Sequence, residues 1–210
     1  MCRSAQEADL KIDSVLVVGC GGLGGFVIEG LARLGIKNLV LMDGDSFCES
    51  NMNRQLESGL DTLGEHKALV YKSRLEKKFG INAKAIPAFL DETNEDVIKS
   101  VDVVMDCVDT ISARLFLAKT CEKYGKVLIH GGLEGSQGQV CVCFPDDNKI
   151  AKLYAGKDEQ KHSTNVYTVA TIASLEVSLV HKLMLGKEDE LKNKLILADL
   201  DSFAIDTIRI

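Results

Sequence analysis

The stretch that most constrains the fold of this chain is VVGCGGLGGFVIEGLARLGIKNLVLMDGD, from Val17 to Asp45. It opens with apolar residues of the kind found in a strand buried on both faces, and a glycine-rich turn follows. Apolar residues at helical spacing then run from Gly22 to Leu34, and Gly35 is suited to end that helix. A second apolar run, NLVLMD, completes a strand–turn–helix–strand unit. Such a unit predicts an α/β protein with a parallel sheet.

The same alternation continues along the first two-thirds of the chain. We expect helices over Glu65 to Phe79, which we interpret as exposed, over NEDVIKS and over Ser112 to Tyr124. We expect strands at AKAIPAF, VDVVMDC and KVLIHGG, the first of them peripheral because it contains Pro87. Strands without helices between them follow at GQVCVCFP, KLILADL and FAIDTIRI. The predicted fold is therefore a Rossmann-like, mostly parallel sheet flanked by helices and extended by antiparallel C-terminal strands.

Two further segments belong to this prediction. The polar, lysine-rich stretch from Asp146 to Asn165 is interpreted as a long surface loop. The apolar stretch from Val166 to Leu185 carries charged residues within it, so we interpret it as a helix buried on most sides or in a dimer interface, not as a membrane span. At 210 residues, the chain is expected to form a single nucleotide-binding domain over residues 1–210.

Charge and cysteine usage limit the partners and the compartment. The net charge of −6 argues against a nucleic-acid partner, because binding to phosphates needs a surplus of basic residues. The seven cysteines are odd in number and irregularly spaced, and several lie in apolar runs, which is typical of free thiols in a reducing cytosol. The N-terminal sequence MCRSAQEADLKID has no apolar signal core. We therefore predict a cytoplasmic protein without a membrane segment.

The glycine turn predicts a nucleotide site. Gly19, Gly21 and Gly24 have the G-x-G-x-x-G spacing between a strand and a helix, and Gly22 lies among them. Glycines there allow a tight turn and close approach of phosphates to the free N–H groups of the helix. Asp43 ends the next strand, where an acid can accept the ribose hydroxyls. The turn alone leaves NAD, FAD and ATP as alternatives.

Later motifs narrow the choice. DGDSFCESNMNRQ contains Asn51, Arg54 and Gln55, LGEHK contains Lys67, and VVMDCVDTISAR contains Asp109 and Arg114. In this order the motifs closely resemble the ThiF/MoeB/HesA family, relatives of the ubiquitin-activating enzymes. The resemblance extends from about Lys11 to Leu200. It implies an adenylyltransferase that uses ATP and Mg²⁺ to activate the C-terminal glycine carboxylate of a ubiquitin-like sulfur-carrier protein. The carrier would be ThiS-like or MoaD-like, with a Gly-Gly C-terminus, and would belong to thiamine or molybdopterin biosynthesis.

The resemblance also implies roles for individual residues. A carboxylate can reach a triphosphate only if positive charge offsets their repulsion, and Arg54 and Lys67 would supply that charge. Asp109 would hold Mg²⁺ and completes the predicted catalytic set. The predicted nucleotide-binding residues are Gly19, Gly21, Gly22, Gly24, Asp43, Asp45, Asn51, Arg54, Gln55 and Lys67. Members of the family usually form homodimers, so a homodimer is expected here too.

Departures from the family refine the expected reaction. Some relatives carry a cysteine in the loop that crosses the active site, but the segment Asp146 to Asn165 contains none. We therefore expect the reaction to stop at the acyl-adenylate. The C-x-x-C pairs that bind zinc in some relatives are absent, and Cys141 and Cys143 are spaced C-x-C on one face of a predicted strand. Two alternatives remain: ATP-dependent activation of another carboxylate or amide on the same fold, and an NAD-binding Rossmann oxidoreductase.

Overall fold

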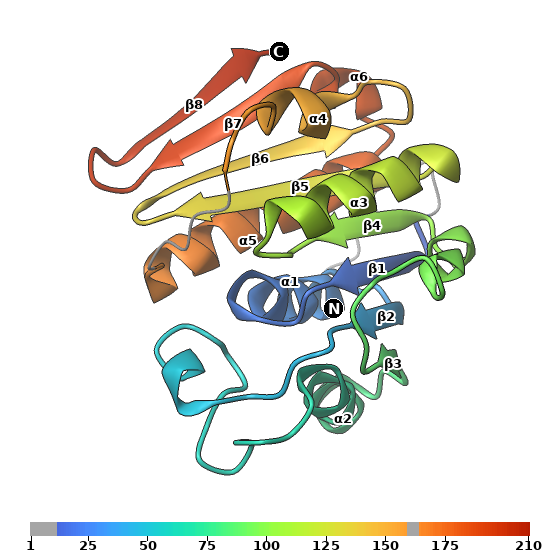
Figure 1. Ribbon diagram of the computed structural model, residues 1–210, viewed down its shortest axis with the longest axis vertical. Coiled ribbons are helices and arrows are strands. Elements are labelled where there is room, and N and C mark those ends of the chain that lie inside the picture. The colour runs from blue at the N-terminus through green and yellow to red at the C-terminus, as the bar shows by residue number, and fades with distance from the viewer. Residues whose placement is uncertain (1–11, 159–163) are drawn as a thin grey trace.

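The strands form one mixed sheet in the order β3-β2-β1-β4-β5-β6-β7-β8 in the computed structural model, which describes residues 12–158 and 164–210 (Figure 1). The strands are β1 (Ser14–Val18), β2 (Asn38–Met42), β3 (Lys84–Ile86), β4 (Val103–Asp106), β5 (Val127–Glu134), β6 (Gln137–Cys143), β7 (Lys194–Asp199) and β8 (Ala204–Arg209). Strands β3, β2, β1, β4 and β5 pair in parallel, whereas β6, β7 and β8 continue the sheet in antiparallel pairing. The predicted fold class is confirmed.

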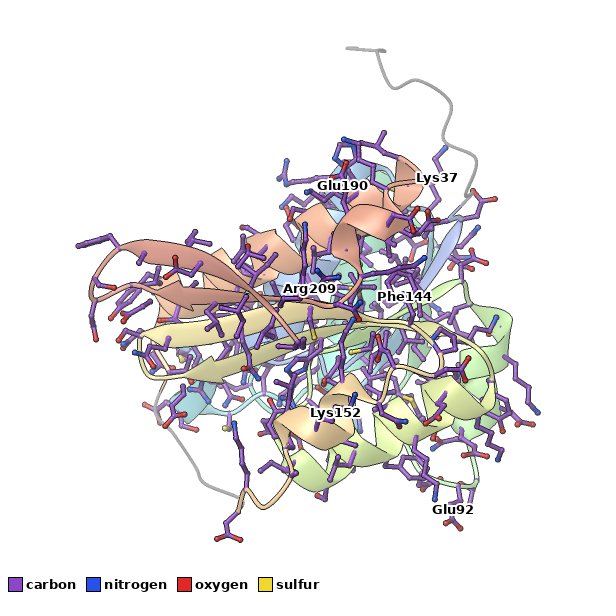
Figure 2. The ribbon with its side chains drawn as sticks, turned by 90° about the horizontal axis from the view of Figure 1, so that it is seen from above. Lys37, Glu92, Phe144, Lys152, Glu190 and Arg209 are labelled. Atoms are coloured by element: carbon purple, nitrogen blue, oxygen red, sulfur yellow. The ribbon has the colours of Figure 1, made fainter. Side chains whose placement is uncertain are left out.

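Helices cover both faces of the sheet. One face carries α1 (Gly22–Leu34), α2 (Lys67–Phe79), α5 (Val166–Met184) and α6 (Glu188–Leu191). The other carries the 3₁₀ helix η2 (Glu95–Ser100), α3 (Ile111–Lys123) and α4 (Lys149–Leu153), and a second 3₁₀ helix, η1 (Glu49–Asn51), lies in the β2–α2 connection. Figure 2 shows the two layers, with Lys152 of α4 on one side of the sheet and Lys37 and Glu190 on the other. The sheet is therefore the middle layer of three.

The apolar run of β1 lies at the centre of this arrangement. Val15 and Val17 pack into the core that includes α1 and α5, and Leu16 packs into the core that includes α3. All three side chains are fully buried. A strand covered on both faces needs apolar residues at successive positions, which is why this run shows no alternation with polar residues.

Two predicted elements differ from the structure. The helix predicted from Glu65 begins at Lys67, and it is not simply exposed, because Val70, Tyr71 and Leu75 pack into the core. The segment predicted as a loop from Asp146 to Asn165 contains α4, a short helix that forms because Ile150 is buried in the core beneath α3. Residues 159–163 of that segment lie outside the described part of the chain.

The long apolar segment forms α5, and its apolar side is used within the chain. Ile172, Leu179 and Leu183 are buried in the core shared with α1, and α5 also lies against β5 and β6. Its outer side carries the exposed Ser174 and Ser178. The first of the two predicted roles, a helix buried on most sides, fits this arrangement better than an apolar dimer surface along its length. Among the described helices, none combines the length and hydropathy that crossing a bilayer requires.

Candidate nucleotide site

The glycine turn lies where the ends of three parallel strands meet. Val18 of β1 is in register with Met42 of β2 and with Asp106 of β4. The chain leaves the sheet at the same edge from all three strands. The turn after β1, the acidic segment after β2 and the loop after β4 are thereby brought together, which is the usual ligand position in an open α/β sheet.

Two of the glycines have steric reasons for lacking a side chain. Gly19 has φ of +91°, and a Cβ placed on it would lie 2.5 Å from the carbonyl oxygen of Cys107. A Cβ on Gly24 would lie 1.8 Å from the carbonyl oxygen of Gly19. The turn therefore packs against the β4 loop on one side and against its own helix on the other, as the predicted spacing requires.

Asp43 ties the glycine turn to the end of β2. Its two carboxylate oxygens accept hydrogen bonds from the backbone N–H of Cys20 (2.6 Å) and of Asp45 (2.7 Å). Burial raises the pKa of Asp43, while those two hydrogen bonds and the charge of Lys67 act in the opposite direction. A carboxylate oxygen can accept more than one hydrogen bond, so the geometry leaves capacity for ribose hydroxyls.

Lys67 is a buried cation beside this segment. Its ammonium Nζ lies 3.0 Å from Oδ2 of Asp45, and its backbone N–H donates to the Asp45 carbonyl oxygen at 3.0 Å. The Lys67 side chain is only 7% exposed, while that of Asp45 is 57% exposed. A lysine in an ordinary surface position would be solvated, so this burial distinguishes Lys67 from the other lysines of α2. Asp45 orients the Lys67 ammonium.

The motif formed by Asn51, Arg54 and Gln55 packs against the glycine turn. The Asn51 carbonyl oxygen accepts the backbone N–H of both Arg54 (3.1 Å) and Gln55 (2.9 Å). The Gln55 amide nitrogen would lie 3.5 Å from a Cβ on Gly21, and the Arg54 carbonyl oxygen 3.6 Å from a Cβ on Gly22. The half-buried Arg54 guanidinium donates to the carbonyl oxygen of Ser50 and to the side-chain oxygen of Asn53.

One buried atom of this motif is unpaired. Oε1 of Gln55 has no hydrogen-bond partner among the described residues. A buried polar atom without a partner costs free energy, so such an atom beside a glycine cradle is the kind of group that a bound polar ligand satisfies. This observation fits a nucleotide at the turn.

Asp109 is exposed in the loop between β4 and α3. An aspartate after a strand often caps the following helix, but here Thr110 is the cap, accepting a hydrogen bond from the Ala113 N–H at 3.3 Å. The Asp109 carboxylate therefore does not have a capping role. The nearby contact of Cys107 with Gly19 places this loop against the glycine turn.

A buried ionic cluster behind Asp109 was not assigned a role from the sequence. The Arg114 guanidinium contacts Oδ2 of Asp106 (3.0 Å), Nδ1 of His130 (2.6 Å) and the carbonyl oxygens of Gly131 (2.7 Å) and Val108 (2.6 Å). The segment VVMDCVDTISAR carries the pattern D-x-x-D-T-x-x-x-R, so the same motif that contains Asp109 could have indicated Asp106 and Arg114. His130 could not be predicted in this way, because it looks like an ordinary histidine at a strand end.

In the described part of the chain, the candidate site is not a metal site built from several protein ligands. Over residues 12–158 and 164–210, no group of three or more His, Cys, Asp or Glu side chains could hold a metal ion by itself. The Sγ atoms of Cys141 and Cys143 lie 3.7 Å apart in the core, so the predicted placement of both on one face of a strand is confirmed.

Comparison with known proteins identifies the group to which this arrangement belongs. The model of the ThiF family matches residues 2–210. A SAMP-activating enzyme E1 of Haloferax volcanii is 28% identical over 96% of this chain, which covers 78% of that protein. A molybdopterin-synthase adenylyltransferase of Haemophilus influenzae is 36% identical over 68% of this chain, with 59% of that protein covered.

Solved structures share the fold. E. coli MccB with ATP superimposes with a TM-score of 0.75 at 24% identity, covering 95% of this chain and 64% of that one. PaaA superimposes with a TM-score of 0.77 at 19% identity, covering 94% of this chain and 73% of that one. At these identities the likeness concerns the fold alone. The chain spans less than two-thirds of MccB and of the Haemophilus protein.

Proposed function

The chain belongs to the ThiF family, and from this we propose that it is an adenylyltransferase that uses ATP and Mg²⁺ to activate a C-terminal carboxylate. The proposed substrate is the terminal glycine of a ubiquitin-like sulfur-carrier protein with a Gly-Gly tail, either ThiS-like or MoaD-like. The products are an acyl-adenylate and pyrophosphate. The names of two relatives, a SAMP-activating E1 and a molybdopterin-synthase adenylyltransferase, support this substrate class.

The observation that carries the proposal is the buried ammonium of Lys67, held by Asp45 beside the glycine turn. A carboxylate that approaches a triphosphate is repelled, because both groups are negatively charged. Two unit charges about 4 Å apart interact by about 4 kcal/mol at an effective dielectric of about 20. A fixed cation offsets this repulsion without reorganising during the reaction. Arg54 is the second cation in our proposal, and it would exchange its contacts with Ser50 and Asn53 for phosphate oxygens.

The remaining predicted residues would bind the rest of the nucleotide. The glycine turn at the start of α1 would hold phosphates on its N–H groups. Asp43 would accept the ribose hydroxyls, and Asn51 and Gln55 would add neutral hydrogen bonds. The unpaired Oε1 of Gln55 supports this placement.

Asp109 is the proposed Mg²⁺ ligand. One or two carboxylates together with phosphate oxygens suffice for Mg²⁺, so an exposed carboxylate at the edge of the turn fits that ion. Bound Mg²⁺ supplies charge neutralisation and orients the phosphates. With Thr110 capping α3, the Asp109 carboxylate can turn toward the metal without loss of the cap.

We propose that the reaction ends at the acyl-adenylate. The segment from Asp146 to Asn165 contains no cysteine, and Cys141 and Cys143 of the preceding strand are buried. A thioester or acyl disulfide needs a thiol that the activated carrier can reach. Sulfur would therefore be delivered by another protein.

We also propose a homodimer, through a surface other than the outer side of α5. Met52, Leu56 and Leu60 are exposed in the connection after β2, and Val166 and Tyr167 are exposed at the start of α5. The two segments are neighbours, because the Arg54 carbonyl oxygen and the Val169 side chain both lie against Gly22. Exposed apolar residues that gather in this way are typical of an interface.

The test is ATP–pyrophosphate exchange with a panel of carriers. Each ThiS-like or MoaD-like carrier is assayed beside a matched version that lacks its terminal Gly-Gly. We expect exchange with at least one intact carrier and none with its truncated form. Asp109→Ala should abolish exchange and leave the thermal unfolding curve unchanged, whereas Asp206→Ala, an exposed aspartate on β8, should leave exchange intact. No exchange with any intact carrier would remove the sulfur-carrier assignment.

The same panel separates the alternatives. Exchange that requires a free peptide or another carboxylate or amide, and not a Gly-Gly carrier, would favour the other substrate class. Tight binding of NADH without magnesium-dependent binding of ATP would favour an oxidoreductase.

A further inference from the structure

Behind the loop that carries Asp109 lies a chain of buried and half-buried polar side chains that extends to the end of α4. The chain runs from Asp106 and Arg114 through His130 to Tyr154 and Gln139. Asp106 and His130 are fully buried and Arg114 is 6% exposed. Tyr154 is the residue at which α4 ends. The cluster therefore spans from the end of β4 to the end of a helix that is distant in sequence.

His130 lies within hydrogen-bonding distance of both Arg114 and Asp106. Its Nδ1 is 2.6 Å from Nη1 of Arg114 and 2.8 Å from Oδ2 of Asp106. Nη1 of Arg114 also donates to Oδ2 of Asp106 and to the Gly131 carbonyl oxygen. Nδ1 accepts from Arg114 when Nε2 carries the ring hydrogen and donates to Asp106 when Nδ1 carries it, so His130 is hydrogen-bonded to this pair in either tautomer.

The opposite side of the ring contacts Tyr154 and Gln139. Nε2 of His130 lies 3.3 Å from the Tyr154 hydroxyl and 3.2 Å from the Gln139 amide nitrogen. The Tyr154 ring meets the His130 ring edge-on at 5.6 Å between centroids, and the Arg114 guanidinium carbon lies 5.1 Å from the Tyr154 ring centroid. His130 thus joins two hydrogen-bonded groups that would otherwise be separate.

The link to the candidate site is the Val108 carbonyl oxygen. Nη2 of Arg114 donates a hydrogen bond to this oxygen at 2.6 Å. Val108 immediately precedes Asp109 in the sequence. The Gly19 turn packs against the same loop at the Cys107 carbonyl oxygen. The backbone before Asp109 is therefore held by both the glycine turn and Arg114.

We propose that His130 and Tyr154 are positioning residues that act through Arg114 to hold the Asp109 loop in place for magnesium nucleotide, which couples the end of α4 to the metal-binding carboxylate. This deepens and rests on the proposed function. Neither residue contacts the nucleotide cradle, and their effect is on the geometry of Asp109. Fixed placement of a single carboxylate matters because Mg²⁺ demands near-ideal octahedral geometry.

Two substitutions at His130 distinguish its contact with Asp106 from its contact with Tyr154. The Asn amide in His130→Asn reaches Asp106 as Nδ1 does but cannot reach Tyr154, whereas the Gln amide in His130→Gln extends toward Tyr154 as Nε2 does. Tyr154→Phe keeps the ring contacts and removes the hydroxyl. Tyr124→Phe, which removes a hydroxyl that donates to Glu95 and Asp96 at the far end of α3, is the matched control.

The first measurement is hydrogen exchange in the nucleotide-free chain. We expect Tyr154→Phe and His130→Asn to speed exchange of the amides between Cys107 and Ala113 by about five- to tenfold, as loss of one buried hydrogen bond implies. Exchange in β1 and α1 should not change. Tyr124→Phe should match the unmodified chain. Unchanged exchange between Cys107 and Ala113 in both variants would overturn the proposal.

The second measurement is ATP binding by calorimetry, with Mg²⁺ and with a chelator. We expect the variants to weaken binding by about tenfold with Mg²⁺ and to leave binding in chelator unchanged, because only the metal ligand is misplaced. Equal weakening in both conditions would indicate general structural damage and overturn the proposal. Both measurements are independent of any carrier, so a failure of pyrophosphate exchange would leave this inference standing.

Discussion

Buried polar residues in this chain fall into two kinds at the residue scale. Asp43 and Lys67 are buried with partners, through backbone N–H groups and through Asp45 respectively. Glu176 of α5 is fully buried, and neither of its carboxylate oxygens has a hydrogen-bond partner among the described residues. It faces Gly131, where a Cβ would lie 2.6 Å from the Glu176 carboxyl carbon. Asp43 and Lys67 are proposed to act in the candidate site, whereas the unpaired carboxyl of Glu176 is a cost to stability.

Glu176 predicts a pH-dependent stability. Burial, followed by the charge of Asp106, raises the pKa of Glu176 well above its usual value. In the unfolded chain, the Glu176 carboxyl loses its proton above about pH 4.3. In the folded chain it keeps the proton to higher pH. The free energy of unfolding therefore falls as the pH rises from about 4.3 toward the folded pKa. Glu176→Gln removes the titration. We expect the variant to melt higher than the unmodified chain at about pH 8, by about 2–4 °C for each kcal/mol removed, and by much less at about pH 5.

Calorimetric melting of both proteins across that pH range is the measurement. A difference in Tm that is the same at both ends of the range would contradict the raised pKa.

At the scale of elements, the glycine turn and its flanking strand and helix could be predicted from sequence. The periodicity and the end residues determine α1, whose bounds match the prediction. The start of α2 was placed too early, because Glu65 and His66 are polar residues that could belong to either a turn or a helix. The sequence does not predict α4, because the burial of Lys149 and Ile150 depends on β6 and α3 lying beside it. A short helix of this kind has no periodic signal of its own.

The tight packing of the turn gives a prediction for Gly24. Gly24→Ala would place a Cβ 1.8 Å from the Gly19 carbonyl oxygen, which backbone movement alone can relieve. We expect a loss of more than about 3 kcal/mol of unfolding free energy, or no folded protein. Gly35→Ala is the control: Gly35 has φ of +101° with no atom within 4 Å of a Cβ, so only backbone strain of about 1 kcal/mol is expected.

Urea unfolding of the two variants compares them directly. Equal losses would mean that the close approach inside the turn is not what requires glycine.

At the scale of the whole molecule, the candidate site forms because β2, β1 and β4 are neighbours. Parallel strands deliver their C-terminal ends to one edge, so the sequence motifs after each strand could be expected to converge. The polar link from Arg114 to Tyr154 could not be expected. It depends on β4, β5 and β6 being adjacent in the sheet and on α4 packing over them. Nothing in the local sequence of His130 or Tyr154 indicates the contact of His130 with Asp106 or with Tyr154.

The proposed dimer surface can be tested with Leu60. Its side chain is 84% exposed, so Leu60→Asp should not alter the fold of the monomer. We expect a dimer by light scattering for the unmodified chain and a shift to monomer, by at least about tenfold in the dissociation constant, for the variant. Phe203→Asp, 88% exposed at the β7–β8 turn, should remain dimeric. A monomeric unmodified chain would contradict the proposed assembly.

The most direct measurement follows a radiolabel in the α-phosphate of ATP into a Gly-Gly carrier, with label in the γ-phosphate as the parallel experiment. The account predicts that α-label and no γ-label becomes attached to the carrier. It also predicts that Lys67→Ala lowers this labelling on the order of a hundredfold, as expected for loss of a preorganised charge. Lys77→Ala, at an exposed lysine of the same helix, should label the carrier normally. Attachment of γ-label, or unchanged labelling by Lys67→Ala, would contradict the central claim that a fixed cation at the glycine turn lets a terminal carboxylate reach the α-phosphorus.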